Sequence, residues 1–376
     1  MPVQFDPKIH LAYAPPESRI MMADLGKADE GIAPPFPLLS EEGVRAIREE
    51  IFSSHILDRC THTTDLAPCQ IRGMSCRPGF ASFNEALWTH SETIRVVSEA
   101  AGIDLVPIIP YELGHVNVQL TFGAETLSKL GREPLRAKAP VVRQESVVPK
   151  LVPGFNNLPA LIPSTDSDTE SEGEVELLSP VSPEVKKAEP FVAEAGAPSL
   201  PEPEPEKDEH QPVVGWHRDS YPWVCVLMLS DATTMQGGET ALACADGSVR
   251  KIRGPQMGWA IMLQGRYIDH AALSAYSAPE RVTMVTSYRA RDVMVADDSV
   301  LTTVRRMANL NELYYEWSTY RLDLLSERFR HQSKVLKKKR EDGQGQWGEE
   351  IVKKDELKAW CREQIKYLQT TIDEMV

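Results

Sequence analysis

Three side chains in two short stretches have the types and spacing needed to hold a metal ion. His217 and Asp219 stand two residues apart in VVGWHRDSY, and His270 follows later in RYIDHAAL. In a β-strand, side chains at positions i and i+2 point to the same face, so His217 and Asp219 can reach one point while Arg218 points away. Two histidines and one carboxylate form a facial ligand set that suits non-haem Fe(II) and leaves coordination positions open.

An arginine and a hydroxyl follow these three residues. Arg281 and Thr283 stand two residues apart in RVTMVTSYR, so a strand places both on one face. The order HRD, H, RVT resembles the Fe(II)- and 2-oxoglutarate-dependent dioxygenases, whose pattern is His-x-Asp, a long gap, His, a short gap and Arg-x-Ser. Thr283 stands where Ser is commoner, and it keeps the hydroxyl.

Two further segments carry the same resemblance. GGETAL at 237–242 is similar to the turn and strand after the first metal-bearing strand of prolyl-hydroxylase-like members, and GWAIMLQG at 258–265 is similar to the strand before the distal histidine. The resemblance covers residues 105–122 and 212–292. Elsewhere the chain loosely resembles uncharacterised fungal dioxygenases.

The resemblance implies the chemistry of the site. Fe(II) would be held by His217, Asp219 and His270, and 2-oxoglutarate, the cosubstrate with O2, would place its distal carboxylate on Arg281 and Thr283. The implied reaction hydroxylates or otherwise oxidises a C–H bond of a small molecule and releases succinate and CO2. Two alternatives stay open: a protein side-chain hydroxylase, and a non-catalytic jelly-roll scaffold that binds partners through its acidic insertion and C-terminal helices.

Other polar residues of the expected strands are candidates for ligand contacts. His115, Asn117 and Gln119 alternate with apolar residues in the segment HVNVQL, so Asn117 and Gln119 either face the cosubstrate or face solvent on an outer strand. Ser287 and Arg289 share the strand face of Arg281 and are candidates for substrate contacts. Arg289 can equally pair with an acid at the rim.

The elements that must position these residues indicate an α+β, mainly β fold. Short strands at regular spacing predict a double-stranded β-helix, or jelly roll, over 105–123 and 212–292. Residues 1–104 form a strap and helices on the barrel, including a helix that begins after an N-cap at Ser40 and another over 82–101 with a capping box of Ser82 and Glu85. Residues 305–376 show helical spacing and predict a C-terminal helical hairpin, which covers the barrel or mediates self-association.

Charge separates one segment from the rest. The net charge of the chain is −14, and residues 151–210 alone hold 14 acidic and 3 basic residues. This Pro-rich composition predicts a disordered insertion over 124–211. Ser and Thr residues among its acids, at 164–171, and two Ser-Pro sites predict phosphorylation by a kinase; the alternative is a merely solubilising loop. The nearly balanced remainder argues against a nucleic-acid partner.

The cysteines and the apolar segments of the chain indicate the cellular compartment of the protein. The six cysteines form no CxxC pair, so free thiols in a reducing compartment are expected. No apolar run reaches the length of a membrane span, so no membrane partner and a cytoplasmic location are expected. The basic run KVLKKKR at 334–340 is either a nuclear signal or the stabilised C-terminal end of a helix.

Overall fold

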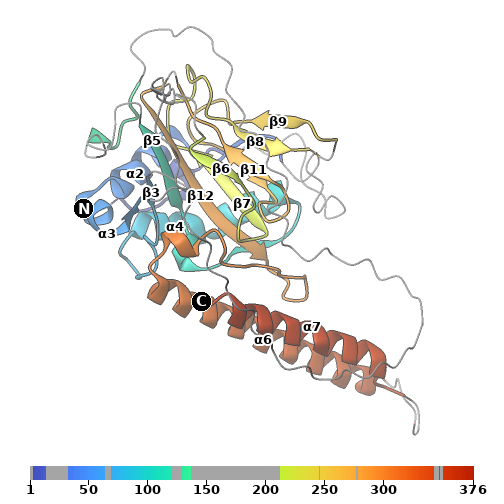
Figure 1. Cartoon of the computed structure of the whole chain (residues 1–376). Helices are drawn as coiled ribbons and strands as arrows, with labels where there is room; N and C mark the ends of the chain where they lie inside the picture. Colours follow the sequence, from blue (N-terminus) through green and yellow to red (C-terminus); the bar gives the residue numbers. More distant parts are fainter. Residues whose placement is uncertain are drawn as a thin grey trace, which may run out of the picture. The chain divides into compact units, whose positions relative to one another are not determined.

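The computed structural model describes residues 3–13, 33–63, 69–120, 127, 129–136, 212–244, 246–276, 278–342, 347 and 350–376. Together these residues form a mixed helix and antiparallel-sheet fold (Figure 1). The helices are α1 Pro7–His10, α2 Glu41–Ile51, α3 Ser54–Cys60, α4 Ser82–Thr89, α5 Ser91–Ala101, α6 Leu310–Glu341 and α7 Lys354–Asp373. None of the described helices is long and apolar enough to cross a membrane.

A larger antiparallel sheet is built around its longest strand, β12, Glu280–Ala290. In the described part of the chain β12 pairs with β7, Trp223–Met228, on one side and with β5, His115–Leu120, and β4, Leu105–Pro107, on the other. The sheet continues outward through β10 Trp259–Leu263 and β1 Phe36–Pro37 beyond β7, and through β3 Gln70–Ile71 and β2 Thr61–His62 beyond β5.

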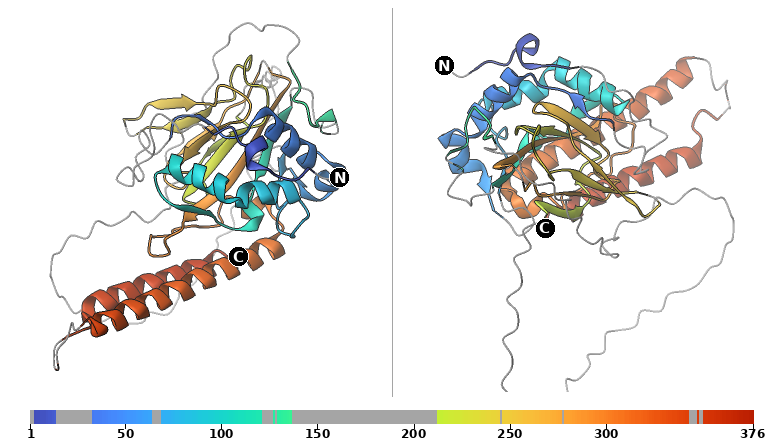
Figure 2. Two further views of the ribbon diagram at one scale, coloured as in Figure 1. Left: turned by 180° about the vertical axis from the view of Figure 1, so that it is seen from behind. Right: turned by 90° about the horizontal axis from the view of Figure 1, so that it is seen from above.

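A smaller antiparallel sheet lies against one face of the larger one. It is formed by β6 Val214–His217, β11 His270–Ala272, β8 Thr240–Ala243 and β9 Val249–Ile252, in that order. Apolar side chains of both sheets, among them Val224, Val285 and Leu242, pack together between them. The opposite face of the larger sheet packs on the N-terminal helices, with Cys225, Val282 and Met284 in that core (Figure 2).

The N-terminal helices begin where local capping allows. The predicted cap of α2 is confirmed, since the Ser40 hydroxyl accepts a hydrogen bond from the Gly43 amide at 3.0 Å. The predicted capping box at Ser82 is wrong, and the single helix expected over 82–101 breaks at His90 into α4 and α5. Glu50 of α2 instead accepts hydrogen bonds from the amides of Phe83 and Asn84 in the first turn of α4. The start of α4 is therefore capped by a carboxylate from another helix and not by a neighbouring residue.

The predicted C-terminal helices are present as α6 and α7, which lie side by side (Figure 1). Buried Trp317 of α6 donates a hydrogen bond to the Thr371 carbonyl of α7 at 3.2 Å. Glu316 on α6 accepts a hydrogen bond from the Tyr111 amide at 2.6 Å, which ties α6 to the segment just before β5. Self-association through these helices stays a prediction.

Most of the predicted acidic insertion, including its phosphorylation sites, lies outside the described residues. The described residues near its start make contacts with α2: the Gly131 carbonyl accepts a hydrogen bond from Arg48 at 2.9 Å, and Arg132 pairs with Glu49 at 3.0 Å. The segment therefore leaves the larger sheet past α2.

Candidate active site

The two histidines are brought together by the pairing of two short strands. His217 ends β6, His270 begins β11, and the two residues are direct partners across the antiparallel pair, with ring centroids 4.3 Å apart. Asp219 lies between them in space. Its Oδ1 is 3.4 Å from Nε2 of His217, and its Oδ2 is 3.3 Å from Nε2 of His270. One candidate ligand atom from each of the three residues lies within 4.8 Å of the others.

The backbone fixes which ring nitrogens face this point. Nδ1 of His217 lies 2.7 Å from the Gly215 carbonyl, and Nδ1 of His270 lies 2.9 Å from the Ile268 carbonyl. A carbonyl only accepts hydrogen bonds, so each Nδ1 carries a proton, and Nε2 is the ring atom of each histidine that faces Asp219. Donors bound at about 2.1 Å to one ion and at right angles to one another lie about 3 Å apart. The three residues could therefore hold a divalent metal ion.

Asp219 is not on the strand that sequence periodicity assigned to it. β6 ends at His217, and residues 218–222 turn toward β7. The Asp219 amide donates a hydrogen bond to the Gly265 carbonyl at 2.8 Å, which returns the carboxylate to the histidines. A Cβ atom on Gly265 would lie 2.1 Å from Oδ2 of Asp219, so only glycine leaves room for it. No sequence pattern indicated this requirement, although Gly265 is the last residue of the segment GWAIMLQG.

The charge of Asp219 is stabilised by the two imidazoles. Burial by itself raises the pKa of this carboxyl group, but the charge of His270 and hydrogen bonds from both rings outweigh burial and hold the pKa well below its usual range. The carboxylate therefore stays ionised and available as an anionic ligand.

An ion pair joins the two segments that carry the candidate metal ligands. Arg218, which points away from the site as expected, donates to Asp269 from Nε at 3.0 Å and from Nη2 at 2.8 Å. About a third of the Asp269 side chain is exposed to solvent. Because Arg218 lies between two ligands and Asp269 precedes the third, this bidentate pair fixes the two segments relative to each other.

Arg281 is a buried cation without a carboxylate partner among the described residues. Its side chain is 2 % exposed; Nε donates to the Gly238 carbonyl at 3.1 Å and Nη1 to the Thr283 hydroxyl at 3.2 Å. Burial, and after it the charge of Arg253, lowers the pKa of Arg281 to about 10, so the group is still charged at neutral pH. A buried guanidinium with free donors is suited to binding an anion.

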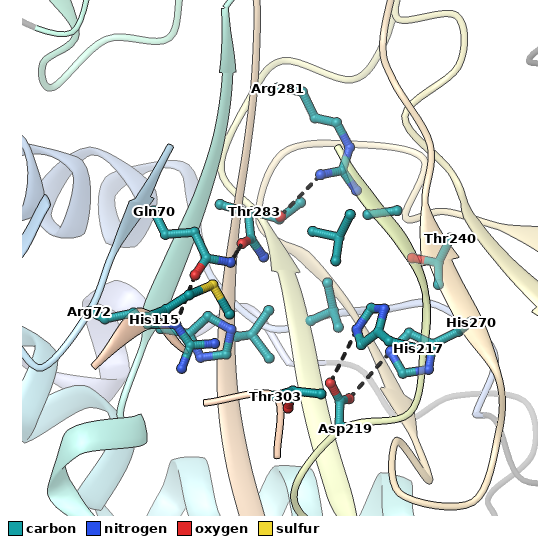
Figure 3. A pocket seen from close by; sticks show the side chains of 16 residues that line it. Gln70, Arg72, His115, His217, Asp219, Thr240, His270, Arg281, Thr283 and Thr303 are labelled. Atoms are coloured by element: carbon teal, nitrogen blue, oxygen red, sulfur yellow. Dashed lines mark hydrogen bonds and ion pairs between the residues drawn. The ribbon is translucent and has the colours of Figure 1, made fainter. Parts of the chain in front are cut away.

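Arg281 and the metal ligands line one cavity of about 70 Å³. In Figure 3, Arg281 lies at one end, His217 and His270 line one side, and Arg72 and His115 lie on the other side. Its lining residues are Gln70, Arg72, His115, Asn117, Val214, His217, Asp219, Val226, Thr240, His270, Ala272, Arg281, Thr283, Val285, Thr303 and Met307.

The two polar residues expected from β5 have different positions. Asn117 lines the cavity and is the direct partner of Thr283 across the β5–β12 pair. Gln119 does not line it. Its amide group instead donates to the Ala275 carbonyl at 3.0 Å and accepts from the Ala275 amide at 2.8 Å.

The two candidates for substrate contacts lie further along β12. Neither Ser287 nor Arg289 lines the cavity. Arg289 donates to the Ala290 carbonyl at 2.9 Å, and its guanidinium lies 5.8 Å from the ring centre of Tyr320 on α6. β12 thus passes out of the cavity after Val285 and reaches the C-terminal helices.

A buried polar network across β3 and β5 was not foreseen. Arg72 donates to Glu112 at 2.8 Å and to the side-chain oxygen of Gln70 at 2.9 Å, and the side-chain nitrogen of Gln70 donates to Asn117. Nδ1 of His115 lies 3.4 Å from the second oxygen of Glu112. Burial and the nearby Arg72 lower the pKa of His115, so this ring is neutral at neutral pH. The alternation of β5 was the one signal pointing to this wall; Arg72 and Gln70 gave none.

Comparisons with known proteins give limited similarity. No family model matches the chain, and no curated protein matches it. A 2OG-Fe(II) oxygenase family oxidoreductase from Burkholderia pseudomallei is 22% identical over 20% of this chain and 35% of its own, with a TM-score of 0.17. A Pseudomonas putida prolyl-4-hydroxylase is 23% identical over 21% of this chain and 45% of its own, with a TM-score of 0.18.

The chain therefore spans less than half the length of either structure. Such short alignments with low TM-scores carry no argument about function, which rests on the geometry described above. Both alignments cover about a fifth of this chain.

Proposed function

We propose that this chain is a non-haem Fe(II)- and 2-oxoglutarate-dependent oxygenase that oxidises a C–H bond of a small molecule with release of succinate and CO2. The observation that carries the proposal is Arg281, a buried guanidinium with no carboxylate partner in the described chain, in the same cavity as His217, Asp219 and His270. A dicarboxylate with one end at the metal would supply the missing anion.

The residues of the cavity divide the work of binding the cosubstrate. His217, Asp219 and His270 would hold Fe(II), which supplies the redox chemistry that couples O2 to oxidation of the substrate. Arg281 would hold the distal carboxylate of 2-oxoglutarate with Thr283 as a second donor. The carbonyl of Gly238 and the hydroxyl of Thr283 already orient the guanidinium, so little side-chain entropy is lost on binding.

Asn117 supports the same assignment. Arg72 only donates, so the oxygen of Gln70 must face Arg72 and the nitrogen of Gln70 must donate to the oxygen of Asn117. The amide nitrogen of Asn117 is thereby left as a donor next to Thr283. We therefore assign it to the cosubstrate as well.

We also propose that the two sheets form a double-stranded β-helix. The support is the order in which the chain visits them: β5 in the larger sheet, β6 in the smaller, β7 in the larger, β8 and β9 in the smaller, then β10, β11 and β12 in larger, smaller and larger. His217 and His270 lie on the smaller sheet, Asp219 lies in the turn after β6, and Arg281 lies on the larger sheet.

The test is anaerobic addition of Fe(II) and 2-oxoglutarate, which should give the weak visible charge-transfer band of the chelate. Asp219→Ala should lose the band and at least about a thousandfold of succinate formation, because it removes the only anionic ligand of the set. Asp355→Ala, an exposed carboxylate at the start of α7, is the matched control and should keep both. A folded wild-type protein that gives no band would favour the scaffold alternative.

A further inference from the structure

The cavity has a second guanidinium, at a distance from Arg281, that the binding of 2-oxoglutarate does not use. Arg72 follows β3, is 5 % exposed and lines the cavity. Its Nε donates to Gln70, and its Nη1 donates to Glu112. Among the described residues Nη2 has no hydrogen-bond partner, so one donor of this side chain is left on the wall.

The carboxylate that neutralises Arg72 lies behind the wall of the cavity. One oxygen of Glu112 accepts from Arg72 at 2.8 Å, and the other lies 3.4 Å from Nδ1 of His115. The side chain of Glu112 is 2 % exposed, and Glu112 does not line the cavity. This wall therefore presents donors to the cavity and keeps its negative charge behind them.

Arg72 lies too far from Arg281 to share the binding of the distal carboxylate of 2-oxoglutarate. Figure 3 shows Arg281 and Arg72 in different parts of the cavity, with Gln70 and Thr283 between them, and shows Arg72 and His115 across the cavity from His217 and His270. A molecule bound to Arg281 and the metal leaves the Arg72 side open. A second molecule held there would face the metal.

We propose that Arg72 binds the primary substrate through a carbonyl oxygen of that molecule, in either a carboxylate or a carboxamide group. This inference rests on the function proposed above and adds the chemical class of the substrate. Arg72 is then a substrate-contacting residue, and Glu112 and Gln70 are positioning residues that hold its guanidinium. Two nitrogens of the Arg72 guanidinium are held by hydrogen bonds, so the third nitrogen donates in a fixed direction. A ligand with an acceptor oxygen at that point is bound in preference to an apolar ligand.

The test is ligand-observed NMR on protein loaded with 2-oxoglutarate and Zn(II), a diamagnetic ion that takes the same histidine and carboxylate ligands. The probes are matched acids, amides and hydrocarbons, beginning with benzoate, benzamide and toluene. We expect acids or amides to bind better than their hydrocarbons, and the stronger of the two identifies the group. Arg72→Gln should weaken that binding about ten- to hundredfold, as expected for a hydrogen bond to a charged group.

Three outcomes would overturn the proposal. They are equal binding within the matched sets, unchanged binding to Arg72→Gln, and loss of 2-oxoglutarate instead of the probe. An acid that binds only through the metal ion would leave binding to Arg72→Gln unchanged, so this case also counts against the proposal. Because Arg72→Gln leaves Glu112 buried without its cation, the double variant Arg72→Met/Glu112→Gln is measured too. It should fold and also lose probe binding.

The matched control is Arg95→Gln, an exposed arginine of α5 that does not line the cavity and should keep the probe. Binding of 2-oxoglutarate to each variant separates the two proposals. A wild-type protein that binds no 2-oxoglutarate refutes the proposed function itself, whereas a variant that keeps 2-oxoglutarate and loses the probe supports both.

Discussion

The two faces of β12 bury two arginines in opposite ways. Glu280 and Arg281 are neighbours in the sequence and therefore point to opposite faces of the strand. On the helix side, Arg48 from α2 bonds both oxygens of Glu280, at 2.8 and 3.1 Å, and also donates to three backbone carbonyls. On the cavity side, Arg281 makes two neutral hydrogen bonds and no ion pair in the described chain.

The difference shows that burial of a charge does not by itself mark a site. Arg48 is 0 % exposed and Arg281 is 2 % exposed, so the two differ in their partners and not in their burial. All the nitrogens of Arg48 are satisfied within the protein, which makes it a structural residue. Arg281 keeps donors for a ligand, and the fold bears the cost of that unpaired charge.

The largest expected effect is a difference in stability between variants of Arg48 and Arg281. Arg48→Gln leaves Glu280 buried without its cation and should lower the free energy of unfolding by about 3–5 kcal/mol. Arg281→Gln should lower it far less, because no buried partner is left behind, and should weaken 2-oxoglutarate binding at least about a hundredfold. Urea denaturation and titration with 2-oxoglutarate measure the two effects. The reverse pattern would contradict the contrast.

A buried acid without a cation sharpens the comparison. Glu316 has no basic partner among the described residues and accepts a hydrogen bond from the Tyr111 amide. Burial raises its pKa to about 7 despite that hydrogen bond, and the charges of Glu112 and Glu312 add to the rise. The folded state thus binds the proton more tightly than the unfolded chain, so the stabilisation is present below the unfolded pKa and is lost as pH rises through 7.

Glu316→Gln should remove this dependence. The amide keeps an acceptor for Tyr111 and carries no charge. The free energy of unfolding of the variant, relative to that of the wild type, should therefore rise by roughly 3 kcal/mol between pH 4.5 and pH 8. Urea denaturation across this range measures the difference. Parallel stability curves for the two proteins would show that Glu316 is ionised throughout.

The smallest effect on stability is expected from the half-exposed pair of Arg218 and Asp269. Asp269→Asn should cost at most about 1 kcal/mol of stability, because water screens the pair. It should nevertheless weaken Fe(II) binding about tenfold, since the pair orients the segments that carry the ligands. Titration against a competing chelator measures this. The exchanged pair Arg218→Asp/Asp269→Arg should restore part of the affinity; a further loss would exclude a positioning role.

The sequence alone determined the features that follow from local pattern. The spacing of His217, Asp219 and His270 predicted three side chains that now lie around one point. Alternation predicted β5 but left open whether Asn117 faces the cavity or solvent, and the helical spacing after residue 305 predicted α6 and α7. Each depends on neighbours within a few residues, where the geometry of a strand or a helix dictates which side chains share a face.

Tertiary structure decided which polar groups are left for ligands. Gln119 and Asn117 have the same place in the alternation, but Gln119 is occupied by the Ala275 backbone whereas Asn117 stays in the cavity. Arg48, Arg72 and Arg281 cannot be told apart by residue type. Their roles are set by distant partners, Glu280 for the first, Glu112 for the second and none for the third, because the cost of a buried charge depends on every group packed around it.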